Sequence, residues 1–322
     1  MRAQRGAAIL TAMLTVVLVA TLASATLWQQ WRGVEVESAE RARTQARWVL
    51  AGALDWARLI LREDARQGGA DHLGEPWAVP LAQARLSSFL AADRSDALAA
   101  DAAQDAFLSG QITDLQSRLN TANLLQDGKV HEPSRQAFAR LFKRLGLPEN
   151  ELARMVENLR LAQAAGAQPE ADGKPVAAAP LMPQDLEQLA WLGLSPQTLL
   201  VLRPFVTLLP QRTPVNLNTA PVEVIYACVT AFDWAQAQAF VTARNLSHVA
   251  SVQDANRLAG HSAAAFFNDA QHSVSSHFFE VRGQLQVEQT RVQAQSVVQR
   301  EGMDVKTLRQ QHGVPPVMPP LQ

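Results

Sequence analysis

The chain opens with two helical patterns that follow each other without a break. Residues 7–27 carry no charge, whereas residues 29–66 place apolar side chains three and four positions apart among charged ones. The second pattern is typical of a helix that packs one face against a domain. Neither segment contains proline, so we expect a single helix of roughly 60 residues that ends near Gly68 and Gly69. The predicted packing face carries Val34, Ala46, Trp48, Ala51, Leu54, Arg58 and Leu61.

Beyond this helix, strands and helices are predicted in separate blocks. Residues 81–100 form an Ala-rich amphipathic stretch, and residues 106–120 contain short strands with a turn. From residue 121 to about 268 the apolar spacing is helical, and residues 273–300 alternate apolar and polar side chains as antiparallel strands do. A helical block between two strand regions is best explained by insertion into a sheet domain, so the predicted fold class is α+β.

Two segments have the composition of loops or tails. Residues 164–180 are of low complexity and contain three prolines, which predicts an exposed loop. Residues 313–322 contain four prolines, and we expect this tail to be disordered.

Composition and charge exclude several classes of function. The net charge of −1 gives no general attraction to nucleic acid or anionic lipid. The single cysteine, Cys228, rules out an intrachain disulfide and is interpreted as a buried small hydrophobe. The seven histidines are scattered, and the sequence contains no zinc-hydrolase, zinc-finger, nucleophile-elbow or phosphate-loop motif. We therefore predict that the protein is not an enzyme.

The N-terminus allows three interpretations. Arg2 and Arg5 precede Gly6, and the uncharged run behind them spans about 32 Å as a helix, enough to cross a bilayer core of about 30 Å. The two arginines predict a cytoplasmic N-terminus and export of the rest of the chain. Ala23 and Ala25 fit a secretory signal peptide cleaved behind them. An unprocessed single-pass anchor and a leader cut directly after Gly6 are the other two interpretations.

A short motif in the helical block has two possible uses. Residues 189–199 and 215–226 have the pattern of helical hairpins, with Thr219 predicted as a helix N-cap ahead of Pro221. Asn216 and Asn218 are expected to bond their own backbone and shape the entry turn. Such hairpins resemble helix-hairpin-helix modules, some of which bind DNA. The acidic balance of residues 181–265 disfavours that use, so we predict no nucleic-acid partner.

Four segments, taken in order, carry a resemblance to a known family. Arg5-Gly6 before the apolar run resembles a type IV prepilin leader. Behind it come Gly110–Asn120, Leu208–Pro221 and Ser276–Arg282, with the sequences GQITDLQSRLN, LLPQRTPVNLNTAP and SHFFEVR. Together they resemble the general secretion pathway protein K family of type II secretion. The resemblance covers nearly the whole chain.

This resemblance implies a processing site and a role. A prepilin peptidase would cut between Gly6 and Ala7, and methylation belongs to the same processing. Most pilin-like proteins carry a glutamate at the fifth mature position, which is Thr11 here; its absence is a trait of this family. The implied protein is a minor pseudopilin at the tip of a periplasmic pseudopilus, which helps to initiate it and to export proteins across the outer membrane. The implied location is the inner membrane, crossed once, with the bulk of the chain in the periplasm.

The implied fold is a pilin-like long helix on a small antiparallel sheet, with a large α-helical domain inserted in the sheet. The expected divisions are 1–6 leader, 7–28 transmembrane helix, 29–120 helix and first strands, 121–270 inserted domain, 271–310 last strands and 311–322 tail. Implied partners are other minor pseudopilins and the prepilin peptidase, with the outer-membrane secretin and exoproteins as further candidates. Calcium is a candidate ligand because relatives bind it through acidic loops, and Glu170 and Asp172 are weak candidates for such a site. The alternative is a periplasmic helix-hairpin-helix binding protein released by signal peptidase.

Overall fold

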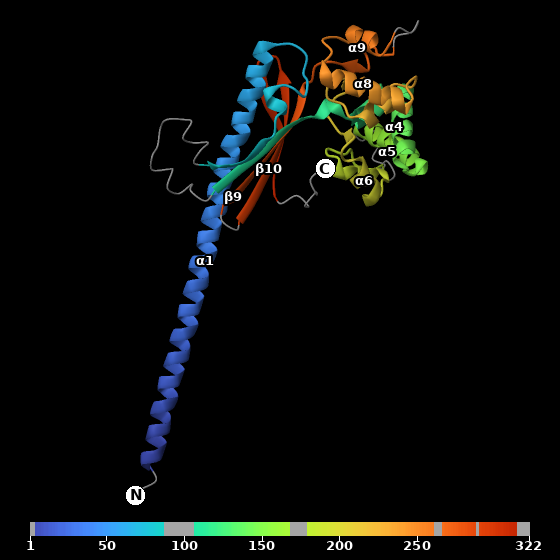
Figure 1. The fold of residues 1–322 in the computed structure, drawn as a ribbon. Coiled ribbons are helices and arrows are strands. Elements are labelled where there is room, and N and C mark those ends of the chain that lie inside the picture. Colours follow the sequence, from blue (N-terminus) through green and yellow to red (C-terminus); the bar gives the residue numbers. More distant parts are fainter. Residues whose placement is uncertain (1–3, 87–105, 168–178, 261–265, 288–289, 314–322) are drawn as a thin grey trace.

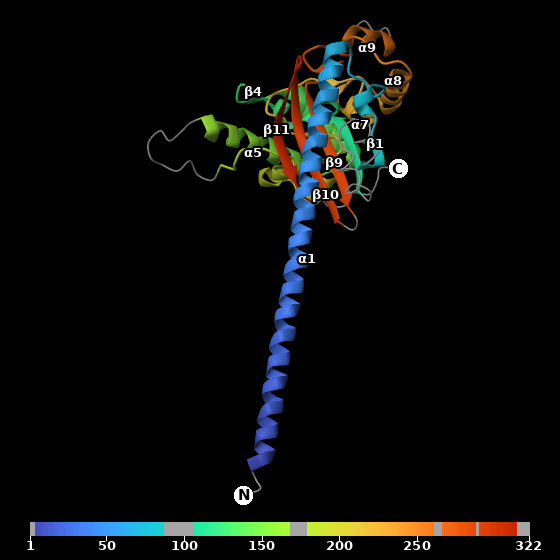
Figure 2. The same ribbon diagram turned by 90° about the vertical axis from the view of Figure 1, so that its left-hand side faces the viewer.

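The longest element of the computed structural model, which describes residues 4–86, 106–167, 179–260, 266–287 and 290–313, is one continuous helix. This helix, α1 (Gln4–Gln67), has 64 residues and is about 96 Å long at ~1.5 Å per residue. Its first half projects as a bare rod, and its second half lies across a sheet (Figures 1 and 2). Ala46 is the first buried side chain along the rod. The prediction of a single helix that ends next to Gly68 is confirmed.

Among the described residues, the sheet has five antiparallel strands in the order β1-β2-β9-β10-β11. The strands are β1 (Leu81–Arg85), β2 (Ala106–Asp114), β9 (Phe278–Val287), β10 (Thr290–Glu301) and β11 (Asp304–His312). One pair of neighbouring strands is far apart in sequence, because β2 pairs along its whole length with β9.

One face of this sheet is covered by α1. Leu50, Leu54 and Leu61 are buried against apolar side chains of the strands. Gly283 lies directly below the helix, and a Cβ there would stand 3.2 Å from Leu50 Cδ2, so glycine lets α1 come close to β9. Burying one such leucine side chain contributes about 1.5–3 kcal/mol, and this row fixes the helix on the sheet.

A helical region is inserted between β2 and β9 and lies on the other side of the sheet from α1 (Figure 1). Its helices are α4 (Glu132–Leu145), α5 (Glu149–Ala167), α6 (Pro196–Leu202), α7 (Val222–Cys228), α8 (Trp234–Leu246) and α9 (Val252–Leu258). Short 3-10 helices cover Pro76–Ala78, Leu115–Ser117, Thr121–Leu124 and Glu187–Leu192.

In the described part of this region, six short strands form three pairs. The pairs are β3 (Leu119–Asn120) with β6 (Val206–Thr207), β4 (Leu125–Gln126) with β5 (Lys129–Val130), and β7 (Val215–Asn216) with β8 (His272–Ser273). The region has its own buried core, separate from the cluster under α1. The predicted α+β fold, a long helix on a small antiparallel sheet with a helical insertion, is confirmed. The division points at 120 and 270 stay predictions.

Several details differ from the sequence-based expectation. The buried stripe of α1 consists of Ala46, Leu50, Leu54, Ala57 and Leu61. Trp48, expected on that face, is 75% exposed, because it lies two residues before Leu50 and therefore on the opposite side of the helix. Residues 106–114 form one strand, β2, where short strands were expected. The tail from residue 314 and most of the 164–180 loop lie outside the described residues.

Candidate functional site

The residues of the expected processing site lie at the start of α1. Gly6 and Ala7 belong to its first turns, and Thr11 follows one turn later. The Thr11 hydroxyl donates a hydrogen bond to the Ala8 carbonyl at 3.0 Å, so it bonds within its own helix. Cleavage after Gly6 and the role of Thr11 stay predictions.

The first half of α1 can cross a membrane. Its most apolar window has a mean hydropathy of 2.2 and is not covered by any other described part of the chain. Trp28 and Trp31 lie near the end of the apolar run with their ring centroids 5.6 Å apart, and both are exposed. Aromatic rings at this place suit the interface between hydrocarbon and water. By its length and composition, the first half of α1 is thus suited to cross a membrane once.

The three internal segments that carry the family resemblance meet at one place, the junction between the sheet and the helical region. Gln116, from the first segment, donates from Nε2 to the Pro214 carbonyl at 3.2 Å and accepts from His277 N at 2.7 Å. Those two residues belong to the second and third segments. These motifs are far apart in sequence, yet each contributes residues to the same junction.

Asp114 is the centre of this junction and is 2% exposed. Its Oδ1 accepts from Gln116 N at 2.7 Å. Its Oδ2 accepts from the hydroxyls of Thr219 and Ser276, both at 2.6 Å, and from Asn216 Nδ2 at 3.1 Å. Burial raises the pKa of this carboxyl to about 6, although the hydrogen bonds from Ser276 and Thr219 oppose the rise. The carboxyl group therefore ties both connections of the helical region to the end of β2.

Arg300 on β10 forms the second centre of the junction. Its guanidinium binds both carboxylate oxygens of Asp71, at 2.6 and 2.7 Å, and Oδ2 of Asp64 at 2.5 Å. It also donates to the Ser276 carbonyl at 2.8 Å, next to the Asp114 network. Asp71 Oδ2 in turn accepts from Ser276 N at 2.6 Å. The end of α1, the last strands and the helical region are thus joined through one set of buried polar groups.

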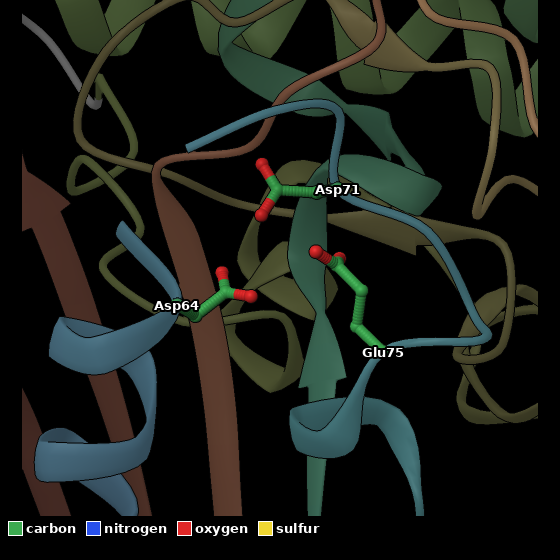
Figure 3. Close-up of side chains that lie close together, drawn as sticks. All are labelled: Asp64, Asp71 and Glu75. Carbon is green, nitrogen blue, oxygen red and sulfur yellow. The ribbon is translucent and has the colours of Figure 1, made fainter. Parts of the chain in front are cut away.

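Asp64, Asp71 and Glu75 form an acidic cluster whose carboxylate oxygens lie within 4.8 Å of one another (Figure 3). A calcium ion needs about six to eight oxygen ligands. Here Arg300 already binds two of the three carboxylates, and Glu75 Oε2 accepts from His72 N and Trp77 Nε1, each at 2.8 Å. The residues present therefore do not fit a calcium site, since the guanidinium takes the place that a cation would need.

The pKa values of Asp64 and Asp71 reflect their burial beside Arg300. Burial is the main cause that raises the pKa of Asp64, and the neighbouring Glu75 carboxylate adds to it. Burial also raises the pKa of Asp71, against the opposing effect of Arg300. The guanidinium of Arg300 thus compensates the negative charge of the two aspartates from within the chain. The calcium candidates from the sequence, Glu170 and Asp172, lie outside the described residues.

Asparagines hold the connections between the junction and the helical region. Asn120 is 1% exposed and donates from Nδ2 to the Gln211 carbonyl and to Thr213 Oγ1, at 2.8 and 3.0 Å. Asn218 donates from Nδ2 to the Val249 carbonyl at 3.0 Å and accepts from Val249 N at 2.9 Å. These side chains replace backbone pairing in loops that would otherwise bury unpaired groups.

The sequence interpretation of this motif was partly right. Asn216 Oδ1 accepts from Asn218 N at 2.9 Å, which confirms the turn expected there. Thr219 is not the N-cap of a helix, because α7 begins at Val222 and its N-cap is Pro221; the Thr219 hydroxyl is directed to Asp114 instead. Sequence reasoning missed Asp71 and Arg300, which are 229 residues apart and match no local motif.

The comparisons with known proteins agree with this architecture. Two family models described as type II secretion system (T2SS), protein K match residues 117–211 and 215–275. The type II secretion system protein K of Pseudomonas aeruginosa is 28% identical over 323 residues, which cover 95% of this chain and 91% of that protein. A chain of the crystal structure of the GspK-GspI-GspJ complex from the type 2 secretion system of enterotoxigenic Escherichia coli has a similar fold, with a TM-score of 0.62 and 20% identity. That match covers 86% of this chain and 99% of the other.

These matches identify a component of a secretion system. The two family models cover the helical region together with its junction, and the alignment with the Pseudomonas aeruginosa protein includes nearly all the rest. The resemblance inferred from the leader and the three internal segments is therefore confirmed. The chain belongs to the type II secretion system protein K family, a family of minor pseudopilins.

Proposed function

We propose that this minor pseudopilin occupies the tip of the type II pseudopilus, where it takes part in initiating the pseudopilus and in exporting proteins across the outer membrane. The observation that carries this proposal is the position of the helical region, which lies beside the end of α1 farthest from the anchor (Figure 1). Subunits that assemble through their long helices stack along the rod axis. A bulky region at the far end obstructs a further subunit above it, which suits the terminal position.

We propose that α1 anchors the chain in the inner membrane before assembly, with its N-terminus in the cytoplasm and the remainder in the periplasm. Support comes from the bare apolar half of α1 and from Arg2 and Arg5 ahead of it. Cleavage between Gly6 and Ala7 would leave the apolar helix intact, so the same segment could serve first as anchor and then as assembly contact.

The nature of Thr11 supports a position without a subunit ahead of it. A carboxylate in lipid is costly and is retained where it has a partner, such as the N-terminus of a neighbouring subunit. Thr11 bears no charge, and its hydroxyl bonds to the Ala8 carbonyl of its own helix. A subunit at the tip has no subunit ahead with which to form such a pair.

The proposed partners are other minor pseudopilins. The Escherichia coli structure with the similar fold contains GspK together with GspI and GspJ. By analogy, we propose that two further minor pseudopilins bind this chain. The prepilin peptidase, the outer-membrane secretin and the exoproteins are further proposed partners.

N-terminal sequencing of the mature protein tests the anchor proposal. A new N-terminus at Ala7 supports it, whereas one at Thr26 would favour a periplasmic protein released by signal peptidase. Gly6→Ala should block processing and secretion. If processing and secretion continue at the wild-type level in this variant, the leader interpretation is wrong.

Pull-down experiments test the tip proposal. The full chain in detergent micelles should retain two minor pseudopilins encoded beside it. Gly33→Glu, on the exposed part of α1 where helices would pack, should reduce this retention, whereas the exposed Asp127→Asn in the helical region should not. Failure to retain any candidate from the same operon would contradict the proposal.

A further inference from the structure

A groove of about 620 Å³ lies on the sheet face opposite α1. Its floor consists of β2, β9, β10 and β11. Arg203, the residue that follows α6 in sequence, forms part of its wall. Because its lining residues come from these strands and from Arg203 of the helical region, the groove lies between the sheet and the helical region. Figure 1 shows that these two parts face each other on the side of the sheet away from α1.

The strand register arranges polar side chains of the floor in rows. One row crosses four strands as Gln111, Arg282, Gln295 and Gln311, and the next contains Ser109, Gln284 and Gln293. Side chains of one row point to the same face because opposite residues of paired strands share a face. The intervening rows, such as Leu108 with Leu285, face α1. The floor is thus a regular array of amide groups around Arg282.

Much of this array has no partner within the described part of the chain. Gln284 and Gln293 bond each other, with 2.6 Å between Nε2 and Oε1. The side chains of Gln111, Gln295 and Gln311 make no hydrogen bond to another described residue. These amides offer donors and acceptors at the spacing of neighbouring strands, about 4.8 Å.

The charge of the groove is one-sided. Its lining contains Arg203, Arg282 and Arg291, and none of the described lining residues is Asp or Glu. Arg203 is paired with Glu187, and Arg282 with the buried Glu280, although Arg282 stays 48% exposed. Arg291 is exposed and forms no ion pair with a described residue. In a chain whose net charge is −1, this concentration of guanidinium groups selects for an anionic partner.

We propose that this groove binds an extended, carboxylate-rich segment of a transported polypeptide. Side-chain amides can bond the main chain of an extended peptide, and the guanidinium groups can bind its carboxylates. A glycan is disfavoured because none of the described lining residues is Phe, Tyr or Trp, the side chains on which sugar rings stack. The source of the segment rests on the proposed function: neighbouring pseudopilins would pack along α1, whereas the groove is open on the opposite side.

Fluorescence anisotropy tests the proposal with the full chain in detergent micelles. The probe is a fluorescein-labelled peptide of alternating Asp and Ser, and the matched control is the peptide with Asn in place of Asp. We expect the Asp peptide to bind more tightly than the control, and its binding to weaken as the ionic strength rises from about 0.05 M to about 0.5 M.

Charge-reversal variants locate the binding. Arg291→Glu should weaken the binding of the Asp peptide about tenfold, and Gln111→Glu about threefold, because both place a carboxylate in the groove. Arg47→Glu makes the same charge change on the exposed side of α1 and should leave binding within about twofold. All three residues are exposed, and circular dichroism with a thermal melt checks that each variant folds.

Several results would overturn the proposal. They are no binding of the Asp peptide at about 1 mM, equal binding of the Asn peptide, and equal effects of Arg291→Glu and Arg47→Glu. Displacement of the peptide by polygalacturonate at lower concentration than by unlabelled peptide would assign the groove to an anionic glycan instead. None of these results bears on the tip position, which N-terminal sequencing and pull-down test separately.

Discussion

The junction and the groove are both polar and share strands β2, β9 and β10. They differ in that the polar groups of the junction are buried and paired, whereas those of the groove are largely exposed. At the junction, Asp114, Asn216 and Arg300 are buried, and their polar atoms bind one another and the backbone. In the groove, the side-chain amides of Gln111 and Gln311 are exposed and have no partner among the described residues.

The difference shows which polar groups serve the fold and which are available for a partner. A buried polar group is costly unless its hydrogen bonds are made, so the junction has to be complete within the chain itself. Exposed amides lose little by staying unpaired, because water satisfies them. We therefore expect changes at the junction to alter stability and changes in the groove to alter binding.

The largest effect is expected from Arg300→Met. The substitution leaves Asp71 buried without its cation, and breaking a buried ion pair in this way costs about 3–5 kcal/mol. Because the junction joins two cores, hydrogen exchange followed by mass spectrometry should show faster exchange in both, around Leu50 and around Phe142. Arg41→Met, which breaks an exposed pair with Glu37, is the control and should cost at most about 1 kcal/mol. Equal effects of the two variants would show that the junction does not hold the cores together.

The second effect is a pH dependence that belongs to Asp114. Its pKa is about 6 in the folded chain and about 3.9 when unfolded, so between these values the folded state holds a proton that the unfolded state has lost. Stability from this residue is therefore present below about pH 4 and is lost as the pH rises to about 6, by about 3 kcal/mol.

Asp114→Asn removes this titration and tests it. The difference in unfolding free energy between wild type and variant, measured by urea denaturation, should change between about pH 4 and about pH 7 in favour of the variant. Asp64 and Asp71 titrate in both proteins, so their contributions largely cancel in the difference. A difference that stays constant over this range would contradict the raised pKa of Asp114.

A smaller effect is expected from Asn216→Ala. This side chain donates to the Asp71 carbonyl, Asp114 Oδ2 and Ser276 Oγ, and its loss leaves buried acceptors unpaired. The expected cost is about 1–3 kcal/mol in urea denaturation. The exposed Asn150→Ala in α5 is a matched control with an expected cost below about 0.5 kcal/mol. If both variants unfold at the same urea concentration, the central position of Asn216 is wrong.

The smallest effect on stability is expected from the groove. Gln311→Ala removes an exposed amide without a described partner, so the unfolding free energy should change by less than about 0.5 kcal/mol. The same variant should weaken binding of the Asp peptide measurably. A loss of stability comparable with that of Asn216→Ala would remove the distinction between junction and groove.

The sequence predicts what depends on local periodicity. The length of α1, its end at Gly68 and the alternation of β9 follow from the spacing of apolar residues and from the positions of glycine and proline. The position of Trp48 could not be predicted in this way, because a helix with several apolar residues offers more than one possible packing face.

The junction could be predicted only in part. The segments around Asp114, Asn216 and Ser276 stand out as motifs, but nothing in one sequence shows that they meet. Asp71 and Arg300 pair across 229 residues of separation, and the pairing follows from the position of the loop after α1 next to β10 rather than from any local pattern. The groove escapes sequence reasoning for the same reason, since its rows exist only once four strands are aligned.

The continuity of α1 also has a mechanical consequence. No proline interrupts the 64 residues between Gln4 and Gln67, and the last of them are fixed to the sheet by buried leucines and to β10 by the Asp64–Arg300 pair. A displacement of the anchor along its axis would therefore move the whole helix, about 96 Å long, as one rigid rod. An axial displacement at the membrane end of α1 would therefore move the junction, and the groove next to it, by the same distance.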